Sequence, residues 1–119
     1  MSRDAHSKKQ NERLAAIQKR YDEEDDEAFK ALLATSDGRQ IVSRHARNCN
    51  WMASVWDEGS ERRTSHSAGR QSVAIDLMAW AERVAPEDFH LMLREASDRD
   101  KAMNEVKAAA LIEKDDDNG

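Results

Sequence analysis

Between residues 67 and 85, apolar side chains recur every three or four residues, which is the repeat of an amphipathic α-helix. At 100° per residue, one continuous arc holds Ala74, Leu77, Met78, Trp80, Ala81 and Val84. The charged side chains of Asp76, Glu82 and Arg83 lie across from that arc. Pro86 ends the pattern, because proline disfavours helical backbone at the preceding residue and suits the first turn of a new helix. The sequence therefore predicts a helix with one buried face over about 67–85, and another helix that starts at Pro86.

The rest of the chain favours an all-α fold in one domain. Its 119 residues include four Gly and one Pro, and 36% of them are charged, a composition too poor in turn-forming residues for a β-sandwich. A chain of this length buries one modest core, which we place within about 30–97. An irregular loop that contains Trp51 and Trp56 should connect the second helix to the third. We expect a single helical domain over 1–119, a small bundle of about four helices over about 7–34, 38–48, 67–85 and from 86 onward.

The first predicted helix is long and charged, and its apolar stripe is incomplete. The acidic run DEEDD at 22–26 interrupts a stripe made of Leu14, Ile17, Tyr21, Ala28 and Leu32. Such a run is usually a solvated helix face. Because helices depend on packing for most of their stability, we expect residues 1–25 and 98–119 to be peripheral and to become ordered by partners.

Two helix boundaries are less regular than the one at Pro86. The segment TSDGRQ at 35–40 supplies a turn, and Ser36 or Asp37 is the expected amino-terminal cap of the second helix. In the last helix, Ser97-Asp98 interrupts the apolar stripe. The pattern leaves open whether that helix continues through it.

A Gly-Arg pair lies where the polar residues 65–68 meet the apolar helix. On the helical wheel Arg70 is aligned with the apolar arc, so we expect its side chain to point inward. A buried guanidinium needs acceptors, and the favoured interpretation is a structural pin in which Arg70 contacts Asp37, with the loop at 57–58 as the other source of acceptors. Gly69 is expected to let another backbone approach closely. Phosphate binding is the alternative, although one glycine falls far short of a phosphate-binding loop.

No set of residues has the spacing of a catalytic, cofactor or metal site, so we expect a protein that is not an enzyme. Cys49 is the one cysteine in the sequence, and it follows His45 by four residues. A zinc site would need His66 or His90 to complete it. A partly buried His and a small apolar Cys are the simpler interpretation. We therefore expect no cofactor and no metal.

Four large apolar residues are candidate partner contacts: Ile75, Leu91, Trp51 and Trp56. Ile75 lies opposite the core arc of its helix, and Leu91 has the corresponding position in the last helix. Tryptophan is enriched at binding hot spots. In so small a protein, however, both tryptophans would serve equally well to complete the core.

The net charge of −5 is unevenly distributed: residues 1–20 carry +4, 21–38 carry −6, 39–70 carry +3 and 71–119 carry −6. The basic segment offers possible phosphate contacts at Arg39, Arg44, Arg47, Arg62 and Arg63. The negative net charge and the lack of a recognition helix disfavour nucleic acid as a partner. No apolar run approaches the length of a membrane span, and the first ten residues lack the apolar core of a signal peptide, so we expect no membrane partner and a cytoplasmic origin.

Three parts of the sequence resemble a family of small proteins that short-tailed phages encode among their head and portal genes: TSDGRQIV at 35–42, the lone Cys49, and SAGRQSVAIDLMAWAERVAPEDFHLMLREA at 67–96. The resemblance covers about 30–97. It is weaker just before Gly69, where the family has an aromatic and an acidic residue and this chain has SHSA.

The resemblance implies a virion or morphogenesis structural protein without catalytic residues. Its expected partners are the portal, the head–tail region or another capsid component, bound by several symmetry-related copies. Its expected location is the virion, and the host cytoplasm before assembly. The alternative is a small DNA-handling accessory protein, such as a packaging or ejected factor, that contacts phosphates through the arginine-rich middle segment.

Overall fold

The computed structural model describes residues 3–52 and 61–118, and the side chains of 61–64 and 113–118 lie outside that description. Within these residues it contains no strand and four helices: α1 (Arg3–Leu33), α2 (Ser36–Asn48), α3 (Glu61–Val84) and α4 (Pro86–Asn118). The predicted all-α fold with about four helices is therefore confirmed. The helix α3 begins at Glu61, earlier than expected, and α4 continues through Ser97-Asp98.

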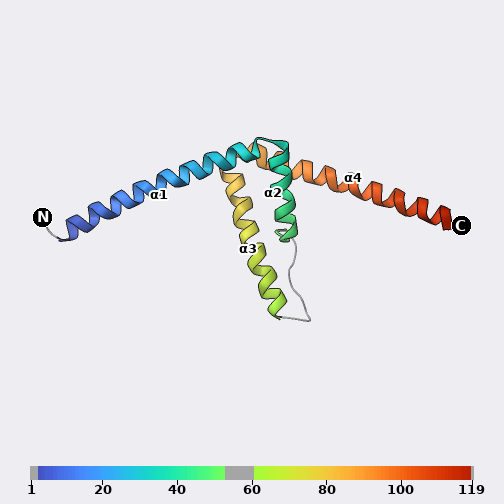
Figure 1. Cartoon of the computed structure of the whole chain (residues 1–119), viewed down its shortest axis with the longest axis horizontal. Coiled ribbons are helices and arrows are strands. Elements are labelled where there is room, and N and C mark those ends of the chain that lie inside the picture. Colours follow the sequence, from blue (N-terminus) through green and yellow to red (C-terminus); the bar gives the residue numbers. More distant parts are fainter. Residues whose placement is uncertain (1–2, 53–60, 119) are drawn as a thin grey trace.

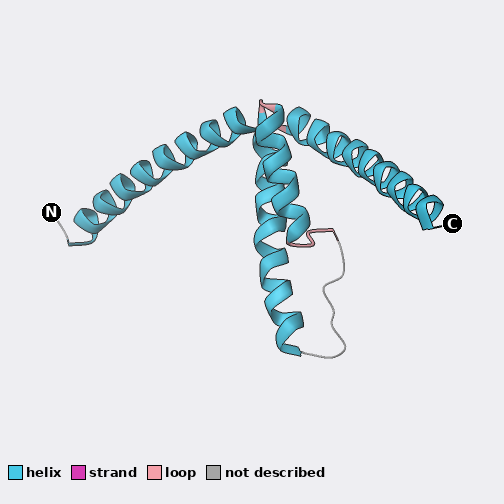
Figure 2. Ribbon diagram, turned by 45° about the vertical axis from the view of Figure 1, so that its right-hand side comes forward, coloured by secondary structure: helices cyan, strands magenta, loops and turns pink. Residues whose placement is uncertain are grey.

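The helices form a flat, three-limbed molecule. In Figures 1 and 2, α2 and α3 run antiparallel as a hairpin, while α1 and α4 leave the same end of that hairpin in opposite directions. The molecule measures 90 × 39 × 16 Å and its radius of gyration is 22.1 Å. A compact domain of this length would have a radius of gyration of about 13.5 Å. The four helices therefore meet at one junction, and much of α1 and α4 lies outside it.

The core lies at that junction, where the carboxyl end of α1 and the first half of α4 pack against the hairpin. Its buried apolar residues are Phe29, Leu33, Val42, Ala46, Ala74, Met78, Ala81, Ala85, Phe89 and Met92. The predicted core face of α3 is confirmed, since Ala74, Met78 and Ala81 are buried and Leu77, Trp80 and Val84 pack against them. Alanines are frequent among the buried residues, and their small side chains let the helix axes approach closely.

The turn between α1 and α2 depends on a threonine cap and a glycine. The Thr35 hydroxyl accepts a hydrogen bond from the Gly38 backbone N–H at 3.0 Å and donates one to the Leu32 carbonyl oxygen at 3.0 Å. The cap is therefore Thr35, and the expectation of Ser36 or Asp37 was wrong by one or two residues. A Cβ atom on Gly38 would overlap the Leu32 carbonyl group, so this tight turn requires glycine.

The boundary between α3 and α4 lies where proline predicts it. The helix α3 ends at Val84, and α4 starts at Pro86 with Glu87 and Asp88 in its first turn, where negative charge is favourable. None of the described helices is long and apolar enough to cross a membrane.

Candidate functional site

The part of α1 that leaves the junction, residues 3–25, is called the α1 arm below. Every side chain from His6 to Asp25 is exposed. Leu14, Ile17 and Tyr21 are each more than half exposed. At 100° per residue these three lie within about 60° of one another, so they form an uncovered apolar stripe.

The α4 arm, residues 101–118, carries a second uncovered stripe. Every side chain from Lys101 to Ile112 is exposed, and Val106 is 69% exposed. On the helical wheel, Met103 and Val106 lie on the same face of α4 as Phe89 and Met92, which are buried at the junction. The face of α4 that builds the core therefore continues along the arm without a covering helix from the described part of this chain.

A polar and aromatic contact fixes the base of the α1 arm to α3. The Asp26 carboxylate accepts hydrogen bonds from Trp80 Nε1 at 2.7 Å and from Arg83 Nη1 and Nη2 at 3.2 and 3.1 Å. The Phe29 ring stacks on Trp80 with centroids 4.2 Å apart. The hydrogen bonds from Arg83 and Trp80 hold the pKa of Asp26 below its ordinary value of 3.8. The acidic run is exposed as expected from Asp22 to Asp25, whereas Asp26 anchors the arm.

The buried arginine at the junction is Arg39, whose side chain links three helices. It is 9% exposed, its Nε lies 2.7 Å from Glu95 Oε1, and its Nη1 donates to the Leu33 carbonyl oxygen at 3.0 Å. Arg39 thereby holds α4 against the carboxyl end of α1. The alternative in which Arg39 contacts phosphate is disfavoured, because its guanidinium is buried and paired.

The predicted contact between Arg70 and Asp37 is wrong, and the other expected source of acceptors, the loop at 57–58, lies outside the described residues. Arg70 is exposed, and its Nη2 donates to the Asn48 carbonyl oxygen at 3.3 Å and lies 3.9 Å from Cys49 Sγ. Asp37 is in the first turn of α2, whereas Asn48 is in its last, so Arg70 and Asp37 lie at opposite ends of that helix. The helical wheel correctly predicts that the Arg70 side chain points toward α2. The helix α2 ends at Asn48, beside Arg70, so it does not cover this side chain. Among the described residues, no atom of another segment lies within 4 Å of a Cβ built on Gly69, so the expected close approach of another backbone is not found there.

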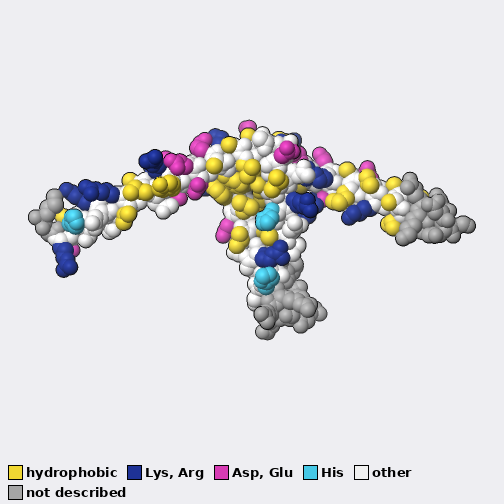
Figure 3. Space-filling model, in the orientation of Figure 1, with side chains coloured by type: hydrophobic (Ala, Val, Ile, Leu, Met, Phe, Trp, Pro, Cys, Tyr) yellow, Lys and Arg dark blue, Asp and Glu magenta, His cyan; other side chains and the backbone are white. Residues whose placement is uncertain are grey.

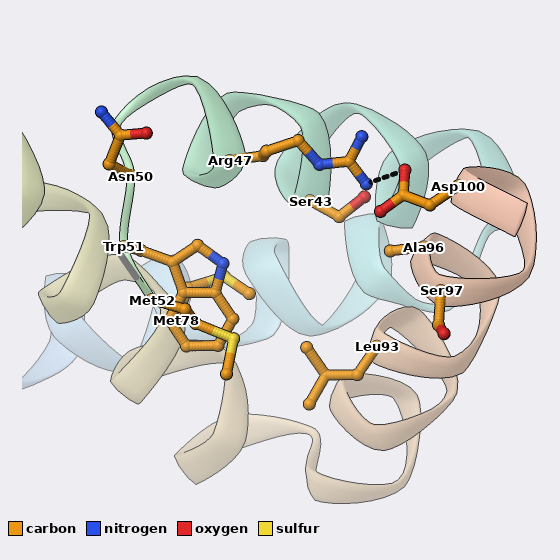
Figure 4. A pocket seen from close by; sticks show the side chains of 10 residues that line it. All are labelled: Ser43, Arg47, Asn50, Trp51, Met52, Met78, Leu93, Ala96, Ser97 and Asp100. Atoms are coloured by element: carbon orange, nitrogen blue, oxygen red, sulfur yellow. Dashed lines mark ion pairs between the residues drawn. The ribbon is translucent and has the colours of Figure 1, made fainter. Parts of the chain in front are cut away.

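A half-open cavity of about 450 Å³ lies between the carboxyl end of α2 and α4 (Figure 4). Trp51, Met78 and Leu93 form its apolar part. At its edge, Arg47 Nη2 lies 2.6 Å from Asp100 Oδ1, and that oxygen is shielded from solvent without a well-aligned hydrogen bond. Trp51 is half-buried and packs against the core. Ser43, Asn50 and Ser97 lie in the same lining, so the cavity is apolar on one side and polar on the other.

The remaining candidates are scattered. Arg44 is exposed on α2, and Ile75 is 46% exposed on α3 while Leu91 is half-buried on α4. The side chains of Arg62 and Arg63, like Trp56 and the loop at 57–58, lie outside the described residues. Ile75, Leu91 and Trp51 stay predicted partner contacts.

The described residues hold no group of three His, Cys, Asp or Glu side chains placed to bind a metal ion. His45, His66 and His90 are all exposed, and Cys49 is half-buried against the core. The zinc alternative considered for His45 and Cys49 therefore receives no support from the described residues.

No family model, curated protein or solved structure matches this chain.

From the sequence we expect 1–25 and 98–119 to lie outside the core and to be ordered by partners, but we do not predict the structural role of Gly38-Arg39 or the apolar stripe along the α4 arm. A signal for the first is present, because Arg39 is three residues before Val42 and seven before Ala46, on one face of α2. A signal for the second is the continuation of one stripe from Phe89 to Val106.

Proposed function

We propose that this protein is a non-enzymatic assembly protein of a bacteriophage particle, which binds other protein helices through its two arms. The observation that carries the proposal is the pair of uncovered apolar stripes on the α1 and α4 arms. The phage context, with the portal, head–tail region or capsid as partners, is supported by the sequence resemblance over 30–97.

The arms suit binding better than catalysis. Helices are stabilised chiefly by packing of an apolar face, and a helix that carries such a face docks readily into a groove or against another helix. The arms also make the molecule 90 Å long, so one small chain reaches over a distance far larger than its core. A protein that bridges neighbouring subunits of a particle uses both properties.

A DNA-handling role receives less support. Of the five arginines considered for phosphate binding, Arg39 is buried with Glu95, and Arg47 is paired with Asp100. The side chains of Arg62 and Arg63 lie outside the described residues, so of the three described ones Arg44 alone is neither buried nor in one of these ion pairs. One such arginine gives little of the charge neutralisation on which non-specific DNA binding depends.

Mass spectrometry of purified particles tests the proposal. We expect the protein to be present at a constant number of copies per particle, and to be synthesised in the host cytoplasm before assembly. Its absence from particles would overturn a virion role. A gel shift at low salt tests the alternative: we expect no shift, whereas salt-sensitive binding to DNA would favour the DNA-handling role.

A further inference from the structure

We infer that the half-open cavity between α2 and α4 is a binding pocket for one aromatic side chain of the partner protein, with the backbone of that residue held by Arg47 and Asp100. This inference rests on the proposed assembly role and names the chemistry of one contact. The cavity lies where the α4 arm begins: its α4 side consists of Leu93, Ala96, Ser97 and Asp100. Ala96 and Met103 are two turns apart on one face of α4, so the cavity adjoins the apolar stripe of the arm. Figure 3 shows hydrophobic side chains on both the junction and the α4 arm.

The cavity is large enough for a ring and the backbone that carries it. Its volume is about 450 Å³, whereas an apolar cavity of about 150 Å³ already holds a benzene ring. Met78 is 2% exposed and closes the cavity toward the core, and Trp51 and Leu93 are half-buried around it. A ring that enters from solvent therefore meets an apolar surface that is already formed.

The apolar side of the cavity favours an aromatic ring over an aliphatic chain. Trp51 contributes an indole ring, and two methionines, Met52 and Met78, line the same cavity (Figure 4). Paired aromatic rings gain energy beyond the area they bury, and methionine sulfur makes favourable contacts with ring edges. Met52 is 78% exposed, so a bound ring would cover apolar surface that is now in water.

The polar side favours a neutral peptide group over a charged ligand. Arg47 and Asp100 have opposite charges, so together they attract neither an anion nor a cation. Arg47 contacts Asp100 through Nη2, and no other hydrogen bond or ion pair of the Arg47 side chain is found among the described residues. Its Nε and Nη1 can donate to a peptide carbonyl oxygen, and a carboxylate can accept from a peptide N–H. The two side chains are 46% and 44% exposed, so a partner's backbone can reach them.

Titration of N-acetyl-L-phenylalaninamide into the full chain tests the pocket, because this probe carries one aromatic side chain between two peptide groups. The readout is NMR of isotope-labelled methionine methyl groups, whose resonances shift when an aromatic ring lies nearby. We expect saturable shifts at Met52 and Met78 and none at Met103 on the α4 arm, with a Kd on the order of 1 mM. N-acetylglycinamide lacks the ring and should cause no shift, and N-acetyl-L-leucinamide should bind at least about threefold more weakly.

Matched variants connect the pocket with assembly. Ala96→Phe places a ring of the chain itself in the cavity, so it should abolish the methionine shifts and lower incorporation into particles at least about tenfold. Ala108→Phe is the control, because Ala108 is exposed on α4 away from Met103 and Val106, and it should change neither. Arg47→Met keeps the apolar side intact and should weaken probe binding at least about threefold, with helical content unchanged in circular dichroism.

Each contrary outcome overturns the inference. Without saturable shifts at Met52 or Met78, the cavity does not bind an aromatic residue. Probe binding that appears only after replacement of Trp56, which lies outside the described residues, would show that the chain itself fills the cavity. Normal incorporation of Ala96→Phe would show that the partner does not use the pocket. These failures leave the proposed virion role standing if the protein is present in particles, whereas its absence from particles would overturn that role without changing the probe titration.

Discussion

Replacing Arg39 by methionine removes the charge that joins α4 to the end of α1 while keeping a long apolar side chain. The substitution leaves two acceptors without their donor, Glu95 Oε1 at 2.7 Å from Nε and the Leu33 carbonyl oxygen at 3.0 Å from Nη1. Losing one partner of a buried ion pair typically costs 3–5 kcal/mol. Because the Glu95 side chain is 27% exposed, water restores part of its solvation, and we expect a loss of about 2–3 kcal/mol in the free energy of unfolding.

The assay is urea unfolding followed by circular dichroism at one fixed protein concentration, since self-association adds to apparent stability. A loss of this size should also lower Tm by roughly 10 °C. Arg44→Met is the control, because Arg44 is exposed on the same helix; its effect should stay within about 0.5 kcal/mol. Arg39→Lys should recover part of the stability, since an ammonium keeps the charge but cannot reproduce the planar contact with both acceptors.

A double-mutant cycle with Glu95→Met isolates the pair itself. We expect a coupling energy of at least about 1 kcal/mol between Arg39 and Glu95. An Arg39→Met protein as stable as Arg44→Met, or additive effects in the cycle, would show that Arg39 and Glu95 do not stabilise the junction as a pair.

Three further predictions concern the turn, the anchor and the arm. Gly38→Ala should lower stability by about 1–3 kcal/mol through overlap with the Leu32 carbonyl, whereas Gly69→Ala, on an exposed helical position, should raise it by about 0.5–1 kcal/mol; thermal unfolding measures both. Because folding lowers the pKa of Asp26, the stability it contributes is complete well above 3.8 and is lost as pH falls through the lower folded value, so Asp26→Asn should flatten the acid limb of a stability–pH curve. Ile17→Glu should prevent incorporation of the protein into particles, as measured by mass spectrometry, while Ala16→Glu, away from the apolar stripe of the α1 arm, should not.

The helices could be predicted from the sequence because the residues that start, end and orient a helix lie within a few positions of one another. Pro86 marks a boundary by its own covalent geometry, and the buried arc of Ala74, Met78 and Ala81 follows from 3.6-residue periodicity alone. Ser97-Asp98 does not interrupt α4, because exposed polar residues cost a helix only a few tenths of a kcal/mol.

The site was harder to predict because it depends on distances between segments. A helical wheel gives the direction of a side chain but not what lies in that direction. Arg70 points toward α2, yet α2 ends at Asn48 and leaves it exposed. Arg39 is buried because Glu95, 56 residues away, lies against it. The same limit applies to the arms, since periodicity marks an apolar face but does not say whether the chain itself covers it.

Hydrogen–deuterium exchange on the two arms, compared between the free protein and the protein in purified particles, tests most directly whether the arms are the assembly surface. We predict that residues 6–25 and 101–112 exchange rapidly in the free protein, where their side chains are exposed, and become protected together in the particle. Equally fast exchange of the arms in both states, or protection that appears in the α2–α3 hairpin instead, would contradict an assembly role for the arms.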